Sequence, residues 1–301
     1  MRRVVTAIAG IVLLTPVSPL RAQAGWQRFL PATRYFDALV ADPLEPRFTL
    51  GLIRTDILER QGPERPPFEL PDAEDSADDV VAAVGIGLSF PIVALAVWAD
   101  GGINLTGHAG VFSRFRIENP SRDDMGQDWV VGGGAEVRKA DVSARVRIHH
   151  RSSHLGDEFS EQTGARRIEF GGEGLEGLIA YRAPGAVRLY GGGSWIFHSN
   201  TAATAVLQAL GRDDRYTVQA GADGEWYPWA GGHVGIHGGV DWQAAQRTNW
   251  RGAAAILGGV GFRRERELRL SARYFTGPST MGEFFLTKEQ LVQIELSGRF
   301  F

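Results

Sequence analysis

Apolar and polar side chains alternate along most of the chain from Arg47 onward. The clearest stretch is 141–154, and the same pattern recurs in 215–227, 233–243 and 268–274. Successive side chains of a β-strand point to opposite faces of the sheet, so a period of two residues indicates strands with one apolar and one polar face. The chain is therefore predicted to be all-β.

About twelve such strands fit the sequence, an even number of the kind found in single-chain bacterial outer-membrane barrels. The connections between them alternate between short turns, as at 183–185, and long loops, as at 199–212. This alternation favours an antiparallel up-and-down transmembrane β-barrel, although a soluble sandwich would show the same period with its apolar face as the core. The strands are expected near 46–54, 80–90, 103–118, 127–138, 140–154, 165–182, 186–198, 213–227, 231–245, 249–263, 266–276 and 289–301.

Two local irregularities accompany this pattern. The segment 91–102 is expected to be a periplasmic turn, although it is long and apolar for that role. The strand over 165–182 changes the parity of its apolar positions near Gly174, which predicts a β-bulge there.

The two ends of the chain favour the membrane barrel. In residues 291–301 apolar and polar side chains alternate, and the segment ends on aromatic side chains, as expected of a closing strand with one face toward lipid. The apolar face holds Val292, Ile294, Leu296 and Phe300. Phe301 falls on the polar side. At the other end, two arginines, an apolar run over 4–14 and an Ala22-Gln23-Ala24 site predict a cleaved signal peptide over 1–24. The apolar run is too short for a spanning helix. The predicted location is the bacterial outer membrane.

Three segments follow from these ends: the signal peptide, a periplasmic N-terminal segment over 25–45, and the barrel over 46–301. Thr33–Val40 is expected to form a turn or two of helix, in the periplasm or just inside the barrel. Residues 61–79 are rich in proline and acidic residues and are expected to be a surface loop.

Composition narrows the function classes. The chain has no cysteine, which excludes disulfides and thiolate chemistry. It has 32 basic against 35 acidic side chains, and the predicted signal removes three of the arginines, so a nucleic-acid partner is not expected. The 39 glycines suit strands of a curved barrel better than helices.

The polar faces of the strands define a candidate lumen. Their charged residues are of both signs, which predicts an ion-paired and hydrated interior more readily than a wide channel, while an excess of arginine would suit passage or binding of small anions. The candidate lumen-lining residues are Arg145, Arg147, Arg188, Arg215, Asp223, Glu225, Asp241, Arg269, Arg273 and Glu295.

Reactive side chains are densest in 149–158, at the outer end of the clearest strand. By parity, His150, Ser152 and His154 continue the row that faces lipid, whereas His149 continues the row that faces the lumen. Histidine as a general base and serine as a nucleophile are a pair used for acyl transfer. The same residues would also suit simple contacts with lipopolysaccharide head groups at a wet barrel rim. A metal site is not expected because the histidines lie on alternate faces; Ca²⁺ remains possible at the acidic run over 72–79.

Two resemblances follow from specific residues. Through 41–48 and the block Ser152-Ser153-His154-Leu155-Gly156-Asp157-Glu158, the chain from about residue 29 to its end resembles the bacterial family known as domain of unknown function 1207, which implies an outer-membrane-type protein. His150-x-Ser152 is similar to the His-x-Ser dyad of outer-membrane phospholipase and lipid A deacylase. That resemblance implies a lipid-facing pair with a third polar residue on a neighbouring strand, for which Glu169 is the nearest candidate by position, although its parity looks luminal; Asp157 and Glu158 are alternatives in the loop.

Three functions stay open at this point. The first is a serine acyl-ester hydrolase acting on outer-leaflet lipid with His150, Ser152, His154 and Glu169 as candidate site residues. The second is a narrow pore or small-solute-binding barrel, and the third is a structural envelope protein without catalysis. The expected partners are outer-membrane lipid, lipopolysaccharide and, during insertion, the barrel-assembly machinery. No cofactor is expected, apart from Ca²⁺ as a possibility.

Overall fold

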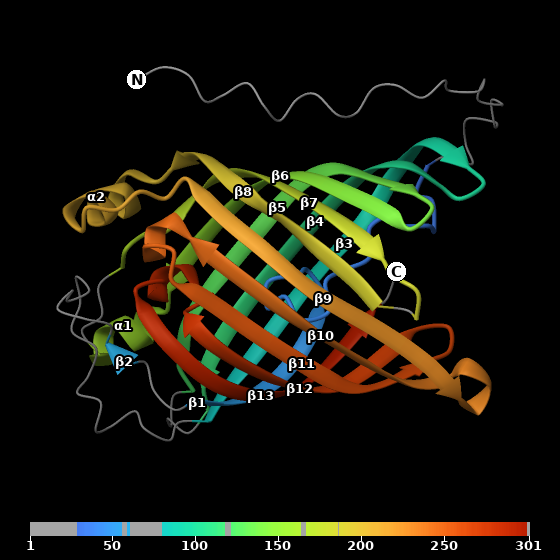
Figure 1. Ribbon diagram of the computed structural model, residues 1–301. Coiled ribbons are helices and arrows are strands. Elements are labelled where there is room, and N and C mark those ends of the chain that lie inside the picture. The colour runs from blue at the N-terminus through green and yellow to red at the C-terminus, as the bar shows by residue number, and fades with distance from the viewer. Residues whose placement is uncertain are drawn as a thin grey trace, which may run out of the picture.

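The computed structural model describes residues 29–55, 59–60, 80–117, 122–163, 167–185 and 187–299, and within these ranges the chain is a closed antiparallel β-barrel (Figure 1). From β3 to β13 each strand pairs with the next one in sequence, and β1 pairs with β3 on one side and with β13 on the other, which closes the sheet. The strands are β1 (Phe48–Thr55), β2 (Glu59–Arg60), β3 (Val80–Trp98), β4 (Gly101–Arg116), β5 (Asp124–Lys139), β6 (Val142–Leu155), β7 (Gly171–Arg182), β8 (Val187–Ser199), β9 (Tyr216–Trp229), β10 (Val234–Ala245), β11 (Gly252–Arg263), β12 (Glu267–Pro278) and β13 (Thr287–Arg299).

Twelve of these strands form the barrel wall, because the two-residue β2 only extends the edge of β13. The predicted fold class is therefore confirmed. Closure satisfies the backbone hydrogen bonds of every strand on both sides, which is what a sheet needs in order to cross a bilayer.

The wall is apolar outside and polar inside, the reverse of a soluble sandwich. On β13, Val292, Ile294 and Leu296 are exposed on the outer face, while Glu295 and Ser297 are buried on the inner face. The same division holds on β6, where Val146 and Ile148 are exposed, while Arg145 and Arg147, which alternate with them, are buried. This arrangement is that of a transmembrane barrel. None of the described helices is long and apolar enough to cross a membrane.

The long connections gather at one end of the barrel, where Figure 1 shows both α-helices. They carry α1 (Asp157–Thr163), α2 (Thr201–Ala209), η3 (Gln246–Thr248) and η4 (Gly282–Phe284), whereas η2 (Ala230–Gly232) lies in a turn at the other end. An apolar cluster joins the loops that carry α1, α2 and η4, and we call it the loop-end cap. Its buried members are Leu155, Phe159, Ile168, Phe170, Ala203, Leu207, Met281, Phe284 and Phe285.

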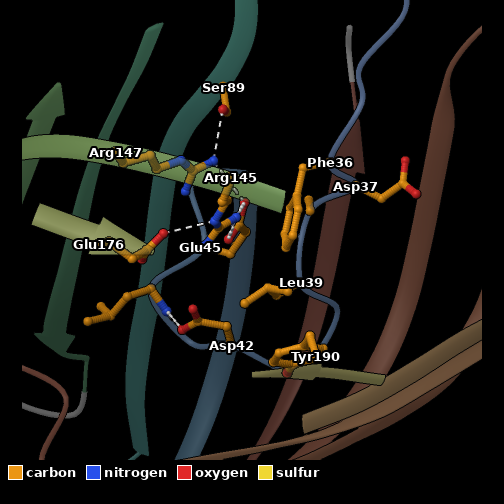
Figure 2. A network of polar contacts seen from close by, with 12 residues as sticks. Phe36, Asp37, Leu39, Asp42, Glu45, Ser89, Arg145, Arg147, Glu176 and Tyr190 are labelled. Atoms are coloured by element: carbon orange, nitrogen blue, oxygen red, sulfur yellow. Dashed lines mark hydrogen bonds and ion pairs between the residues drawn. The ribbon is translucent and has the colours of Figure 1, made fainter. Parts of the chain in front are cut away.

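Residues 34–47, here called the plug segment, lie inside the barrel (Figure 2). Phe36, Leu39 and Ala41 are completely buried, and Phe36 and Leu39 pack on Leu178 of the wall. The sequence left two positions open for this part of the chain, and the structure places it in the lumen rather than in the periplasm. The expected helix over Thr33–Val40 was wrong: the segment is irregular, because its backbone hydrogen-bonds to side chains of the wall instead of to itself.

The predicted turn over 91–102 was also wrong. Residues 91–98 belong to β3, and the turn consists of Ala99 and Asp100 alone. Two register shifts, at Pro91/Val93 and at Ala94/Ala96, keep this apolar stretch paired with β4. The bulge predicted near Gly174 is confirmed by a register shift between Glu173 and Gly174 in the β7–β8 ladder. The signal peptide, the loop over 61–79, Phe300 and Phe301 lie outside the described residues.

Candidate functional site

The His-x-Ser pair lies on the outer face of the barrel, at the end of β6 nearest the long loops. We call this end of the strand its outer end. His150 lies opposite Val131 of β5 and Glu173 of β7, and Ser152 lies opposite Trp129 and Gly171. Val131 and Trp129 are exposed large apolar residues, which marks this face as the one that contacts lipid. The alternation of β6 thus places both side chains where parity predicted.

An acid on the next strand orients the histidine. The Glu173 Oε1 atom lies 2.9 Å from Nδ1 of His150, and Oε2 accepts a hydrogen bond from Nδ1 of His198 on β8. Because a carboxylate only accepts, each imidazole donates through Nδ1, and in the neutral form of His150 the other ring nitrogen, Nε2, is then a proton acceptor. The side chains of His150, Glu173 and His198 are 48%, 35% and 70% exposed, so the cluster is open to the outside.

The pair borders a shallow groove of about 370 Å³ on the outer surface. Gly171, which lies opposite Ser152, also lines this groove. Among the described residues no hydrogen bond joins the Ser152 hydroxyl to His150. We call His150, Ser152, Glu173 and His198 the outward-facing cluster.

The structure places the other candidate residues differently. His154 is exposed on the same row of β6 and lines the groove. Glu169 also lines the groove, but it precedes β7 with a positive φ of 56° and does not hydrogen-bond to His150. The acid bonded to His150 is Glu173, which the sequence interpretation did not select.

Glu173 was missed because the strand was expected to begin at 165, whereas β7 begins at Gly171. A signal for it was present in the sequence. Leu175, Ile179 and Tyr181 share one face of β7, and Glu173 is an acid on that apolar face. His198 lay beyond such reasoning, since the register shift beside Glu173 sets its position.

The inner face behind the cluster is fixed by the loop before β13. Asp128 of β5 is completely buried and accepts hydrogen bonds from Ser153 and Arg151 of β6. The backbone N–H of Gly282 donates to the same carboxylate at 3.1 Å, and the N–H of Glu283 donates to Ser153 Oγ at 3.0 Å. These contacts hold the outer end of β6 from inside.

Glu283 extends this support to the loop before β7. Its carboxylate accepts hydrogen bonds from the backbone N–H groups of Ile168, at 2.7 Å, and Phe170, at 3.1 Å. Burial raises the pKa of Glu283, and the backbone donors oppose that rise.

Most of the predicted lumen residues lie in buried ion pairs with the wall or the plug segment. Arg145 binds Glu45 and Glu176, each at 2.8 Å, and Arg147 reaches Glu45 at 3.4 Å and Ser89 at 3.0 Å (Figure 2). Glu45 belongs to the plug segment, so two wall arginines converge on one plug carboxylate.

The remaining lumen residues repeat this theme along the barrel. Arg188 pairs with Asp223 and donates to the carbonyls of residues 37 and 38; Arg273 pairs with Glu295 and donates to the carbonyl of Ala41. Arg269 pairs with Glu225, and Asp241 accepts from Tyr190. Arg215 does not line the lumen: it precedes β9, is exposed, and pairs with Asp213.

Comparison with known proteins agrees with this architecture. Residues 73–300 match the model of a family described as protein of unknown function (DUF1207). The chain belongs to that family. No curated protein matches it in sequence.

Two solved structures share its fold. One is a Salmonella typhi outer membrane phospholipase dimer with bound calcium, 11% identical, with a TM-score of 0.56 over 87% of this chain and 94% of that one. The other is outer membrane phospholipase A from Escherichia coli, 12% identical, with a TM-score of 0.55 over 86% and 93%. At such low identity the likeness establishes the outer-membrane barrel fold of this DUF1207 protein and nothing finer.

Within the described ranges, no three histidine, aspartate or glutamate side chains are grouped so that they could hold a metal ion. The acidic run over 72–79, the candidate for Ca²⁺, lies outside those ranges.

Proposed function

We propose that this protein is a serine acyl hydrolase that acts on lipid of the outer leaflet, with Ser152 as nucleophile, His150 as general base and Glu173 as the orienting acid. One observation carries the proposal: the hydrogen bond from His150 Nδ1 to Glu173, which directs the free nitrogen of an exposed imidazole outward, two residues from a serine. A base held by a third group is the common feature of such sites.

The reaction follows from these roles. Ser152 Oγ attacks the ester carbonyl carbon while its proton passes to Nε2 of His150. Collapse of the tetrahedral intermediate breaks the bond to the lipid alcohol, which leaves with that proton. Water then gives a proton to His150 and attacks the acyl-serine, which releases the fatty acid and restores Ser152. Glu173 stabilises the imidazolium formed in each half, and His198 fixes the carboxylate from its other side.

The surroundings of the cluster suit a lipid substrate. Trp129, Val131 and Ile148 are exposed around the dyad and offer apolar surface to acyl chains. An ester near the membrane surface would reach Ser152 without entering the barrel. The lumen, in contrast, is filled by the plug segment and its ion pairs at the level of Arg145 and Arg188, which does not favour the pore alternative.

Calcium enters the proposal only as a condition of the assay. The Salmonella typhi phospholipase structure contains it, but the described residues of this chain offer no matching ligand group. We therefore assign no step to a metal and propose that activity be measured both with Ca²⁺ and with a chelator.

The test is fatty-acid release by the protein refolded in detergent, with folding verified by heat-modifiable gel mobility. Phospholipid and lipopolysaccharide are supplied separately. Ser152→Ala and His150→Ala should abolish release, and Glu173→Ala should reduce kcat roughly a hundredfold or more. Thr276→Ala, which removes a hydroxyl from the outer face of β12, is the matched control and should keep full activity. Release that persists in folded Ser152→Ala, or no release by wild type from either lipid, would sink the proposal.

A further inference from the structure

A second candidate site lies inside the barrel. A cavity of about 140 Å³ is bordered by Glu45 of the plug segment on one side and by Phe170 of the loop-end cap on another. Its size is close to that of cavities known to hold benzene, so it suits a ligand of roughly six non-hydrogen atoms. None of the catalytic roles proposed above uses it.

One wall of the cavity is built from histidine, arginine and glycine. His108 of β4 lies opposite Gly132 of β5, which lies opposite His149 of β6. The two imidazoles meet edge to face over this glycine, with ring centroids 6.4 Å apart. A Cβ at Gly132 would lie 2.8 Å from His108 Cε1, so the missing side chain makes room for the ring. Arg147 lies two residues before His149, on the same inner face of β6.

Two polar atoms of this wall lack a protein partner. His108 and Arg147 are each only 4% exposed, and within the described part of the chain neither His108 Nδ1 nor Arg147 Nε has a hydrogen-bond partner. A buried polar atom without a partner costs free energy, so such atoms call for a ligand or water.

The acids beside the cavity already have donors. Glu45 accepts two bonds from Arg145 and one from Arg147, and Asp128 accepts from Arg151, Ser153 and the Gly282 N–H. The contact between Arg147 and Glu45, at 3.4 Å, is longer than the contact between Arg145 and Glu45, at 2.8 Å. The unused hydrogen-bonding capacity is therefore on the donor side.

We propose that this cavity binds a small oxyanion, of phosphate or carboxylate type, through His108 and Arg147. A guanidinium with a free Nε is a strong donor to such oxygens, and an imidazole N–H adds a second direction. The cavity lies on the inner side of the barrel wall, whereas the outward-facing cluster lies on the outer side. Anion binding in the cavity is therefore independent of lipid hydrolysis.

Calorimetric titration of the refolded, full-length protein with inorganic phosphate tests the proposal, against chloride at equal ionic strength. Wild type should bind one phosphate per chain with saturation. Arg147→Gln should weaken binding roughly ten- to a hundredfold, the effect of losing a charge-assisted hydrogen bond. Arg215→Gln removes the same charge from an exposed position and should leave the affinity unchanged.

His108→Ala is the second variant, because the His108 side chain makes no hydrogen bond within the described residues, so the variant should fold even if Arg147→Gln does not. Its affinity for phosphate should also fall. The proposal is overturned if folded wild type gives no saturable binding, or if His108→Ala binds phosphate as tightly as wild type. The first result would leave the cavity to water, and the second would place the bound phosphate away from His108.

Discussion

The plug segment offers a sharp test of the energetics, because two of its acids each meet two arginines in different surroundings. Glu45 is fully buried and accepts three hydrogen bonds from Arg145 and Arg147. Asp37 is 38% exposed and pairs with Arg138 and Arg182 at the surface. The predicted perturbation is Glu45→Gln, with Asp37→Asn as its matched control.

The expected free-energy costs of the two substitutions differ because Glu45 is buried and Asp37 is exposed to solvent. Removing one partner of a buried ion pair leaves uncompensated charge and costs about 3–5 kcal/mol. An exposed pair contributes about 0–1 kcal/mol. The closed strand ladder does not depend on the plug segment, so the penalty should appear as release of that segment rather than as loss of the barrel. A shift of about 4 kcal/mol corresponds to nearly a thousandfold change in the released population.

Thiol labelling measures that release without background, since the chain has no cysteine. A Leu39→Cys probe lies at a position that is 0% exposed and reacts with a maleimide only when the segment leaves the lumen. Labelling should accelerate at least a hundredfold with Glu45→Gln and by less than tenfold with Asp37→Asn, while far-ultraviolet dichroism stays that of a barrel. Equal rates in the two backgrounds would refute the assignment of the plug's stability to the buried ion pairs.

The loop-end cap gives two further predictions. Gly282→Ala would place a Cβ 2.4 Å from Phe170 Cδ1 and 2.7 Å from Ser153 Cβ, so it should destabilise the cap by about 1–3 kcal/mol, seen as faster cleavage of loops by protease. Glu283 has a folded-state pKa above its ordinary value because of burial, so it binds its proton more tightly when folded. The cap should therefore gain stability as pH falls from above the raised pKa to below the ordinary one. Glu283→Gln should flatten that part of the pH profile, and an unchanged slope in thermal unfolding against pH would contradict the assignment.

The wall was predictable because its signal is local. Each strand records its own two-residue period, and closure follows once one face is apolar throughout. The plug segment was not predictable in the same way, since it has no period and its position depends on partners far along the chain, such as Arg145 for Glu45 and Asp223 for the Val40 N–H. Nothing in 34–47 taken alone distinguishes a luminal from a periplasmic segment.

The candidate site likewise has one part that a local pattern predicts and another part that depends on contacts distant in sequence. His150 and Ser152 were found because they share one strand, and parity alone decides which way they point. Glu173 depends on the pairing of two strands across a long loop that contains α1, and a shift of a few residues in the start of β7 exchanges one glutamate for another. Register across a long loop is a tertiary property, so it required the structure.

Strand β6 brings these two levels together. Its inward residues, Arg145, Arg147, Arg151 and Ser153, hold the plug segment and contact the loop before β13, while its outward residues between them face lipid and include the dyad. Because side chains alternate along β6, the residues that hold the plug segment and the residues proposed for catalysis lie on opposite faces of one strand. A β-strand bonded on both sides and pinned from within has little freedom at its outer end, which is the rigidity that a nucleophile and its base require. The buried charges of the lumen therefore have a consequence on the opposite face of the wall: they fix the frame in which His150 meets Glu173.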